Sequence, residues 1–308
     1  MEKKPLFAQA SVVVGLAILC NALWGSAIPF INLGYALFDI PSGATASQIL
    51  FAGCRFFLSG LITILFASAA KKSLVCPARK NVHMVIKLGM LQTVAQYVLF
   101  YMGVARTASV NSAIIQGVSA FVTILIASYV FHTEKMNRLK WIGGALGVAG
   151  VVVMNLGGGI SGGMKFTGEG FLLLSMFAYA FSSGAIKIFS RSENPVALSG
   201  WQFMFGGLVM AIAGFAMGGR LTPGGWGAIA VLLYLSALSA VAYTLWSVLL
   251  KYNPVSRIAP YMFLQPIFGV VLSLAFYGGE LGSLPKYGAA LVLVCLSIMT
   301  IAKGQHQK

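Results

Sequence analysis

Polar and aromatic side chains recur at helical spacing inside long apolar segments of this sequence. Gln116, for example, lies four residues after Ser112 and three before Ser119, so these side chains share one face of a helix. A polar face is costly against lipid, and we therefore expect such faces to point into the protein. Hydrogen bonding between helices is the alternative use, and we favour it for the serines and threonines. The amides and aromatic rings that we predict to line a cavity are Gln96, Tyr101, Gln116, Tyr179, Tyr243, Trp246, Tyr261 and Gln265.

Arg55 carries a strong charge deep inside an apolar segment. If its helix begins near residue 45, Arg55 lies about 15 Å along that helix, close to the middle of a membrane. An ionisable residue at such a depth is a candidate functional residue. Its guanidinium group matches a carboxylate with two parallel hydrogen bonds. It could equally brace helix ends and backbone carbonyls, and both roles stay open.

The elements that must position these residues are predicted to be membrane helices. Of the 308 residues, 58% are hydrophobic and only 9% are charged, against about 25% charged residues in soluble domains. A helix needs about 20 apolar residues to cross the hydrocarbon core. The sequence therefore predicts an all-α integral membrane fold of ten helices, near 9–33, 45–69, 83–104, 109–131, 140–157, 169–188, 197–217, 226–250, 256–277 and 286–303.

The basic residues predict the orientation of these helices. The formal net charge is +15, and the Lys and Arg residues lie in short connections between apolar segments. With the N-terminus inside, sixteen of them fall on the cytoplasmic side and four on the opposite side. We therefore expect a multi-pass protein of the plasma or inner membrane with both termini in the cytoplasm. Because no nucleic-acid-binding motif accompanies the charge, we expect no nucleic-acid partner.

The two halves of the chain resemble each other. Val110 through Tyr129, leading to Glu134, is similar to Val255 through Leu274, leading to Glu280. Five helices in each half is an odd number, so the second half must be inverted in the membrane. The sequence thus predicts two inverted five-helix repeats, residues 9–157 and 169–303, around a central cavity where a transporter would bind its substrate.

In order, spacing and duplication, the motifs of this chain resemble those of the EamA-type branch of the drug/metabolite transporter superfamily, over about residues 11–303. The first half contributes Asn21-Ala-Leu-Trp24-Gly25, Arg55-Phe56, Tyr101-Met-Gly-Val-Ala105, Ala108 to Ala113, and Glu134 before Gly143 and Gly147; the second contributes Tyr243 to Leu250, Gln265-Pro266, and Glu280 before Gly288. The chain departs from the family pattern at Ala120, where first-half sequences usually have proline. It departs again at Phe181, which is the repeat counterpart of Trp24.

The resemblance implies a ten-helix exporter of amino acids and other metabolites. It implies that the first four helices of each half surround the cavity, while the helices at 140–157 and 286–303 brace the outside. It also adds Asn21 and Trp24 to the predicted substrate-binding residues. We expect a monomer or a homodimer, since Gly143 and Gly147 have the spacing for close helix packing.

The predicted energy source follows from which residues lie deep in the apolar segments. All the acidic residues fall in loops or at predicted helix ends, and no nucleotide-binding P-loop is present. We therefore expect facilitated movement of a small-molecule substrate by alternating access, with a proton-coupled carrier as the alternative. The sequence gives no reason to expect a metal or a cofactor, because its four cysteines have no CxxC spacing.

A membrane-embedded enzyme and a channel are the alternatives to a carrier. Ser161 lies in a formal G-x-S-x-G pattern, but that pattern falls in a glycine-rich connection rather than between a strand and a helix. A membrane-embedded enzyme is therefore less favoured. A channel would be expected to have charged rings or filter loops, and the sequence has neither. We predict a protein that is not an enzyme.

Overall fold

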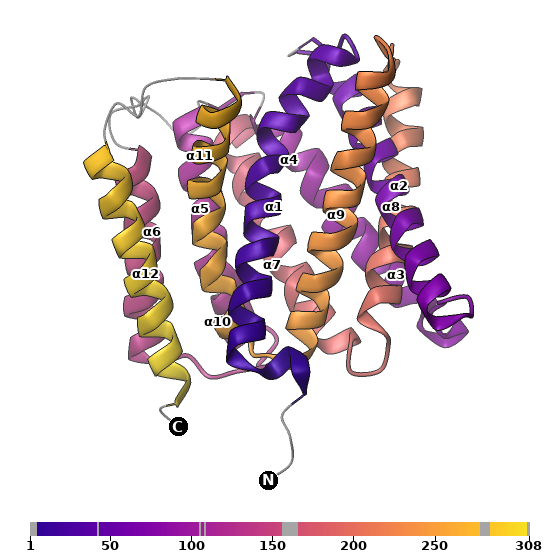
Figure 1. Cartoon of the computed structure of the whole chain (residues 1–308). Coiled ribbons are helices and arrows are strands. Elements are labelled where there is room, and N and C mark those ends of the chain that lie inside the picture. Colours follow the sequence, from indigo (N-terminus) through magenta and orange to yellow (C-terminus); the bar gives the residue numbers. More distant parts are fainter. Residues whose placement is uncertain are drawn as a thin grey trace.

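Helices account for all the regular secondary structure in the parts of the chain that the computed structural model describes, residues 5–41, 43–104, 106–107, 109–155, 166–277 and 284–306 (Figure 1). Most are α-helices, joined by short 3-10 segments (η1, η2 and η5) and π-helical segments (η3 and η4). In chain order they are η1 (Leu6–Ala8), α1 (Ala10–Leu37), α2 (Thr45–Lys71), η2 (Arg79–Asn81), α3 (Val82–Leu88), η3 (Gly89–Ala95), α4 (Gln96–Val104), α5 (Ser109–Tyr129), α6 (Arg138–Asn155), η4 (Phe166–Gly170), α7 (Phe171–Phe189), α8 (Pro195–Ala216), α9 (Trp226–Tyr252), α10 (Val255–Ile258), η5 (Ala259–Leu264), α11 (Gln265–Tyr277) and α12 (Leu284–His306).

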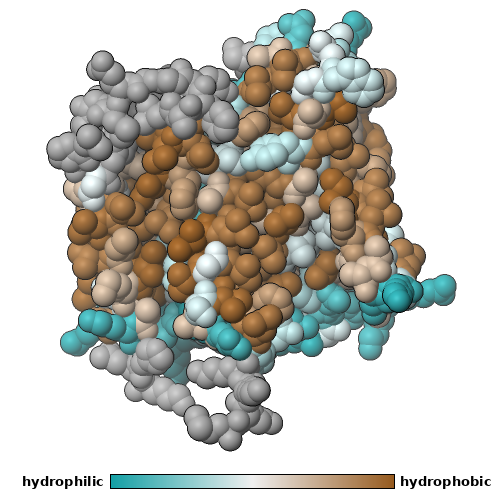
Figure 2. All heavy atoms as spheres, viewed as in Figure 1, coloured by the Kyte–Doolittle hydropathy of each residue, from teal (hydrophilic) through white to brown (hydrophobic). Residues whose placement is uncertain are grey.

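The length and composition of these helices suit a membrane. In the described parts of the chain, eight helical segments are long and apolar enough to cross one, and Ile115–Tyr129 is a shorter apolar helix. Figure 2 shows a broad hydrophobic band between hydrophilic residues at the two ends of the bundle. Large apolar side chains such as Phe66 (75% exposed) and Phe215 (72% exposed) point outward. Their exposure is explained by contact with lipid rather than water.

The helix bounds agree with the sequence prediction to within a few residues, but three predicted helices are not α-helical throughout, and the one expected at 169–188 begins within η4. The helix expected at 83–104 contains the π-helical segment η3, and the helix expected at 256–277 contains the 3-10 segment η5. Pro260 and Pro266 lie within or beside η5 and lack the N–H groups that a continuous α-helix would use. Pro29 lies inside α1.

Helices α2 and α8 pack closely along their length and run antiparallel. Gly53 lies against Met210 and Ala211, whereas Gly200 lies against Ile64 near the other end of α2. Residue numbers therefore increase along α2 in the direction in which they decrease along α8. A Cβ atom at Gly53 would lie 2.3 Å from the backbone nitrogen of Ala211, so only glycine fits there.

Contacts among the other helices follow a regular pattern, and α2 and α8 lie at one side of the bundle (Figure 1, right). Three contacts each occur twice. Helix α1 contacts α9 as α7 contacts α4, α1 contacts α11 as α7 contacts α5, and α2 contacts α9 as α8 contacts η3. Helices α6 and α12 pack on each other at one side of the bundle (Figure 1, left). Residue 5 and residue 306 lie at the same end of the bundle, here named the terminal end, and the opposite end is named the far end.

Candidate functional site

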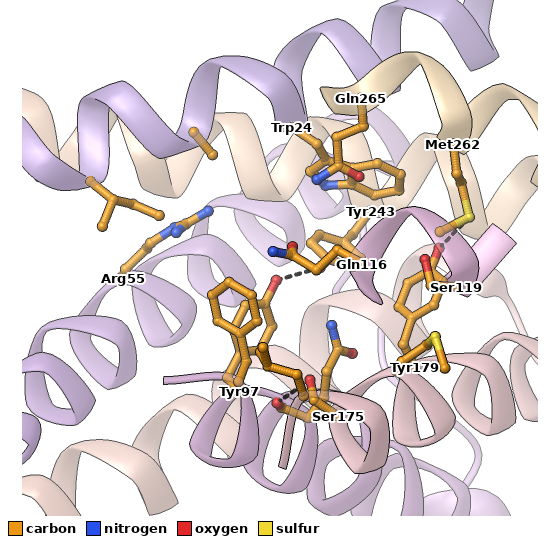
Figure 3. Close-up of a pocket in the computed structure, with 16 residues that line it drawn as sticks. Trp24, Arg55, Tyr97, Gln116, Ser119, Ser175, Tyr179, Tyr243, Met262 and Gln265 are labelled. Atoms are coloured by element: carbon orange, nitrogen blue, oxygen red, sulfur yellow. Dashed lines mark hydrogen bonds between the residues drawn. The ribbon is translucent and has the colours of Figure 1, made fainter. Parts of the chain in front are cut away.

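A pocket of about 140 Å³ lies between the helices (Figure 3). A water molecule occupies about 30 Å³ of the liquid, so the pocket has room for about five water-sized groups, which suits a small metabolite. Helices α1, α2, α4, α5, α7, α9, η5 and α11 contribute its lining. The lining residues are Trp24, Ala27, Ile31, Arg55, Gln96, Tyr97, Phe100, Gln116, Ser119, Leu172, Ser175, Met176, Tyr179, Tyr243, Met262 and Gln265.

The pocket is displaced toward the far end. Helix α1 starts at the terminal end, and its lining residues, Trp24 to Ile31, fall in its second half. Helix α7 runs the other way, and its lining residues, Leu172 to Tyr179, fall in its first half. The terminal half of the bundle is closed by packed side chains such as Val13, Ala17 and Cys20. The site is therefore nearer to one face of the membrane protein than to the other.

Arg55 is the cationic residue of the pocket lining. Its side chain is 2% exposed, and its Nε and Nη2 atoms donate to the hydroxyl of Ser239 on α9, at 3.2 and 2.8 Å. Its Cζ atom lies 5.1 Å from the centre of the Phe56 ring. Lys140 and Glu134 form an ion pair elsewhere in the structure, and no ion pair is recorded between Arg55 and a described carboxylate. A buried guanidinium without a carboxylate partner is a candidate for binding an anion.

The residue that corresponds to Arg55 in the second half of the chain is Gln202, and it is fully engaged. Its amide nitrogen donates to Gln92 at 3.0 Å, and its amide oxygen accepts from Thr93 at 2.8 Å. The neutral residue thus braces α8 against η3, in the position where Arg55 braces α2 against α9. Since an amide suffices for bracing, this contact alone does not account for the charge of Arg55.

Two further buried polar atoms of the pocket lack a protein partner. Trp24 Nε1 and Gln96 Oε1 are buried and have no hydrogen-bond partner in the protein. The first can only donate and the second can only accept. Leaving either without a partner costs about 1–3 kcal/mol, so the pocket is built for a solute, or for water, that offers both an acceptor and a donor.

Aromatic rings form the wall beside Arg55. Trp24 lies edge to face against Tyr243 and Trp246, with ring centres 5.0 and 5.1 Å apart. The hydroxyls of Tyr97 and Tyr243 are hydrogen-bonded to each other across the pocket. Two hydroxyls from opposite halves of the chain therefore meet at the centre of the site.

The other side of the pocket is less polar and contains methionine side chains. In Figure 3, Met262, Ser119 and Tyr179 lie together, away from Arg55. The Tyr179 hydroxyl donates to the Met262 sulfur at 3.5 Å, and a thioether is a weak acceptor. Met176 of α7 also lines the pocket. Methionine side chains adapt to differently shaped apolar groups.

The structure brings most of the predicted site residues together. Trp24, Arg55, Gln96, Gln116, Tyr179, Tyr243 and Gln265 line the pocket. The other four predicted residues lie outside its lining. Asn21 is buried and donates to the carbonyl of Ala17, Tyr101 packs behind Tyr97 and Phe100, Trp246 packs behind Trp24, and Tyr261 lies in η5.

Sequence reasoning did not select several residues that line the pocket. Ser119 and Ser175 belong to polar helix faces, but their composition alone is equally suited to contacts between helices. Met176 and Met262 give no signal, because an apolar residue in an apolar segment can face lipid, core or cavity. Ser161 of the formal enzyme motif and Glu280 of the repeat lie outside the described residues.

Comparison with known proteins agrees with this architecture. The model of the EamA-like transporter family matches the chain twice, at residues 11–156 and 166–301. A protein of Salmonella typhimurium named "Probable amino-acid metabolite efflux pump" is 25% identical over 92% of this chain and 93% of its own. The "Uncharacterized inner membrane transporter YedA" of Escherichia coli K12 is 24% identical over 96% of this chain and 93% of its own.

A solved crystal structure shares the fold. It covers 97% of this chain and all of its own chain, with a TM-score of 0.72 and 13% sequence identity. Together with the apolar helices, the match of the family model to both halves identifies a multi-pass membrane protein. The chain belongs to the EamA-like transporter family.

Proposed function

We propose that this protein carries a small amphipathic metabolite with a carboxylate group, an amino acid foremost, across the membrane by alternating access. One observation carries the proposal. The pocket holds a buried guanidinium for which no ion pair with a described carboxylate is recorded, beside an unpartnered donor on Trp24 and an unpartnered acceptor on Gln96. A carboxylate would bind Arg55 and the Trp24 N–H, and an ammonium group would bind the Gln96 oxygen.

Two further findings support this substrate class. The pocket is the size of a small metabolite, and its methionine side suits an apolar body. Relatives that match over more than nine-tenths of the chain carry the name of amino-acid metabolite efflux pumps. None of the described residues that line the pocket is Asp or Glu, which favours facilitated movement over coupling to protons.

We infer that the membrane domain consists of ten helices in two inverted repeats. Adding 147 to Gly53, Thr63 and Ile64 gives Gly200, Met210 and Ala211. Gly53 lies against the last two of these, and Gly200 lies against Thr63 and Ile64. The bracing contacts of Arg55 with Ser239 and of Gln202 with Gln92 obey the same offset. A contact that maps onto itself when the halves are exchanged supports a two-fold axis between antiparallel repeats.

The proposed orientation has the terminal end in the cytoplasm, because most basic residues lie in connections at that end. We expect a single cysteine at Lys72 or Arg191 to resist a membrane-impermeant maleimide in intact cells, while one at Asp39 reacts. The measurement is labelling before and after permeabilisation, in a protein with the four native cysteines replaced. Labelling of Lys72→Cys from outside would reverse the orientation.

The transport proposal is tested with purified protein in liposomes. A panel of radiolabelled solutes would include neutral amino acids, the matching amines that lack the carboxylate, and the matching acids that lack the ammonium group. We expect saturable uptake of the amino acids, weak uptake of the acids and none of the amines. Uptake that requires an imposed proton or sodium gradient would replace facilitated movement with ion coupling.

The methionine side of the pocket is expected to set selectivity among amino acids. Met262→Ala removes the side chain that lies against Tyr179 and enlarges the pocket there. We expect the preference to shift by about tenfold toward bulkier aromatic side chains, since a few buried methylene-sized groups are worth about 1–3 kcal/mol. Competition of unlabelled amino acids against a common labelled substrate gives the ratio. An unchanged ranking would show that the solute lies elsewhere.

A further inference from the structure

The N-terminal segment, η1, docks where α9 ends and α10 begins. The carbonyl of Phe7 accepts from Asn253 Nδ2 at 2.8 Å, and the carbonyl of Ala8 accepts from Arg257 Nη1 at 3.0 Å. The Phe7 ring stacks on Tyr252, with centres 6.0 Å apart. These contacts join the start of α1 to the junction of two helices more than 240 residues away in the chain.

Asn253 is the centre of this arrangement. It is completely buried, and its side-chain oxygen accepts from Arg257 Nη1 at 2.8 Å. Its backbone carbonyl accepts from Lys187 Nζ at 2.7 Å, which brings in the end of α7. Lys187 also donates to the carbonyl of Lys251 at 3.2 Å, at the negative end of the α9 helix dipole. One node therefore ties together η1, α7, α9 and α10.

The junction is held from its other side as well. The Glu134 carboxylate accepts from the backbone N–H and the hydroxyl of Ser256, and from Lys140 Nζ at 2.6 Å. Helix α10 thus has a fixed anchor on the connection between α5 and α6. To open the terminal end, α1, α7, α9 and η5 would have to move apart, because these elements lie between the pocket and that end. The docked N-terminal segment opposes such a movement without touching the pocket.

We propose that residues 6–8, docked on Asn253 and Arg257, act as a latch that stabilises the state closed at the terminal end. This inference rests on the alternating access of the proposed function. Undocking the latch would shift the protein toward the state in which the pocket opens at the terminal end, and the far end would close at the same time.

Cys20 supplies a native reporter of that movement. It lies one turn of α1 closer to the terminal end than Trp24, it is fully buried, and its sulfur contacts the carbonyl of Ala242 at 3.4 Å. In a protein with Cys54→Ser, Cys76→Ser and Cys295→Ser, the rate of alkylation by N-ethylmaleimide would report opening of the terminal end. Ile31→Cys, in a Cys20→Ala background, would report the far end of the pocket.

Phe7→Ala and Arg257→Met are the test variants, made separately in each reporter background. Both should raise Cys20 alkylation about tenfold, as expected for the loss of one charge-assisted hydrogen bond or of the stacked ring. Alkylation at position 31 should fall by a smaller factor, because the two populations sum to one and Cys20 is buried in the prevailing state. Arg79→Met removes an exposed basic residue near the same end and should change neither rate.

The outcomes separate the latch from the transport proposal. Unchanged Cys20 alkylation in both variants overturns the latch. Faster alkylation at both Cys20 and position 31 overturns it too, because that result is a general loosening of the bundle rather than a shift between two states. Uptake by the unaltered protein in liposomes is measured alongside. Its absence overturns the proposed function, whereas uptake with unchanged reporter rates overturns the latch alone.

Discussion

Arg55→Lys is expected to raise the KM for a carboxylate-bearing solute by about 10- to 100-fold, with little change in folding. Lysine keeps the positive charge but loses the planar fork of N–H groups that matches a carboxylate. A hydrogen bond to a charged group contributes about 1.5–3 kcal/mol, which corresponds to this range. Uptake kinetics in liposomes measure the effect, and the melting temperature in detergent shows whether the variant is folded.

A more informative variant at the same position is Arg55→Gln, because Gln202 already fills the corresponding place in the second half. The amide can still donate to Ser239, so bracing of α2 against α9 should survive while the charge is lost. We expect the melting temperature to stay close to that of the unaltered protein, with loss of most uptake. A folded Arg55→Gln protein with an unchanged KM for the same solute would remove Arg55 from the binding site.

Among the described glycines, Gly53→Ala and Gly207→Ala are expected to be the most destabilising substitutions. A Cβ atom at either position would lie 2.3 Å from a backbone nitrogen, of Ala211 or of Phe57. Backbone in the middle of a packed helix cannot move aside at low cost, and overpacking costs about 1–3 kcal/mol or more. We expect a fall in melting temperature of about 5 to 10 °C, or loss of folded protein.

Two other glycines provide matched controls for this prediction. Gly200→Ala, the repeat counterpart of Gly53→Ala, would meet the flexible end of Ile64 at 2.5 Å and should cost clearly less. Gly15→Ala would meet nothing within 4 Å, and alanine favours the helix more than glycine does. Equal melting temperatures for Gly53→Ala and Gly15→Ala would contradict the close antiparallel packing of α2 and α8.

The sequence predicted the positions of the helices well, because apolar length is a strong signal in a membrane protein. The segments expected at 45–69 and 226–250 are Thr45–Lys71 and Trp226–Tyr252 in the structure. The local departures from α-helix were not predicted. A π-helical turn at Gly89–Ala95 depends on hydrogen bonds that Gln92 and Thr93 make to another helix, and no local pattern encodes those.

The amides and Arg55 of the candidate site were selected from the sequence, whereas its serines and methionines were not. Arg55, Gln96 and Gln116 are conspicuous in apolar segments, so their types alone indicated an inward face. Trp246 and Tyr101 have the same residue types as Trp24 and Tyr97 but lie one layer behind the pocket. Which of two aromatic rings faces a cavity depends on the rotation of each helix against its neighbours. A single sequence does not specify that rotation.

Counterflow in liposomes tests the central claim most directly. Vesicles with purified protein are loaded with an unlabelled amino acid and diluted into a trace of the labelled one, without an ion gradient. An alternating-access carrier with one central site should draw label inward to a transient maximum well above equilibrium, and Arg55→Gln should abolish that maximum. Label that only rises to equilibrium would indicate a channel, and an unchanged maximum in Arg55→Gln would contradict the proposed site.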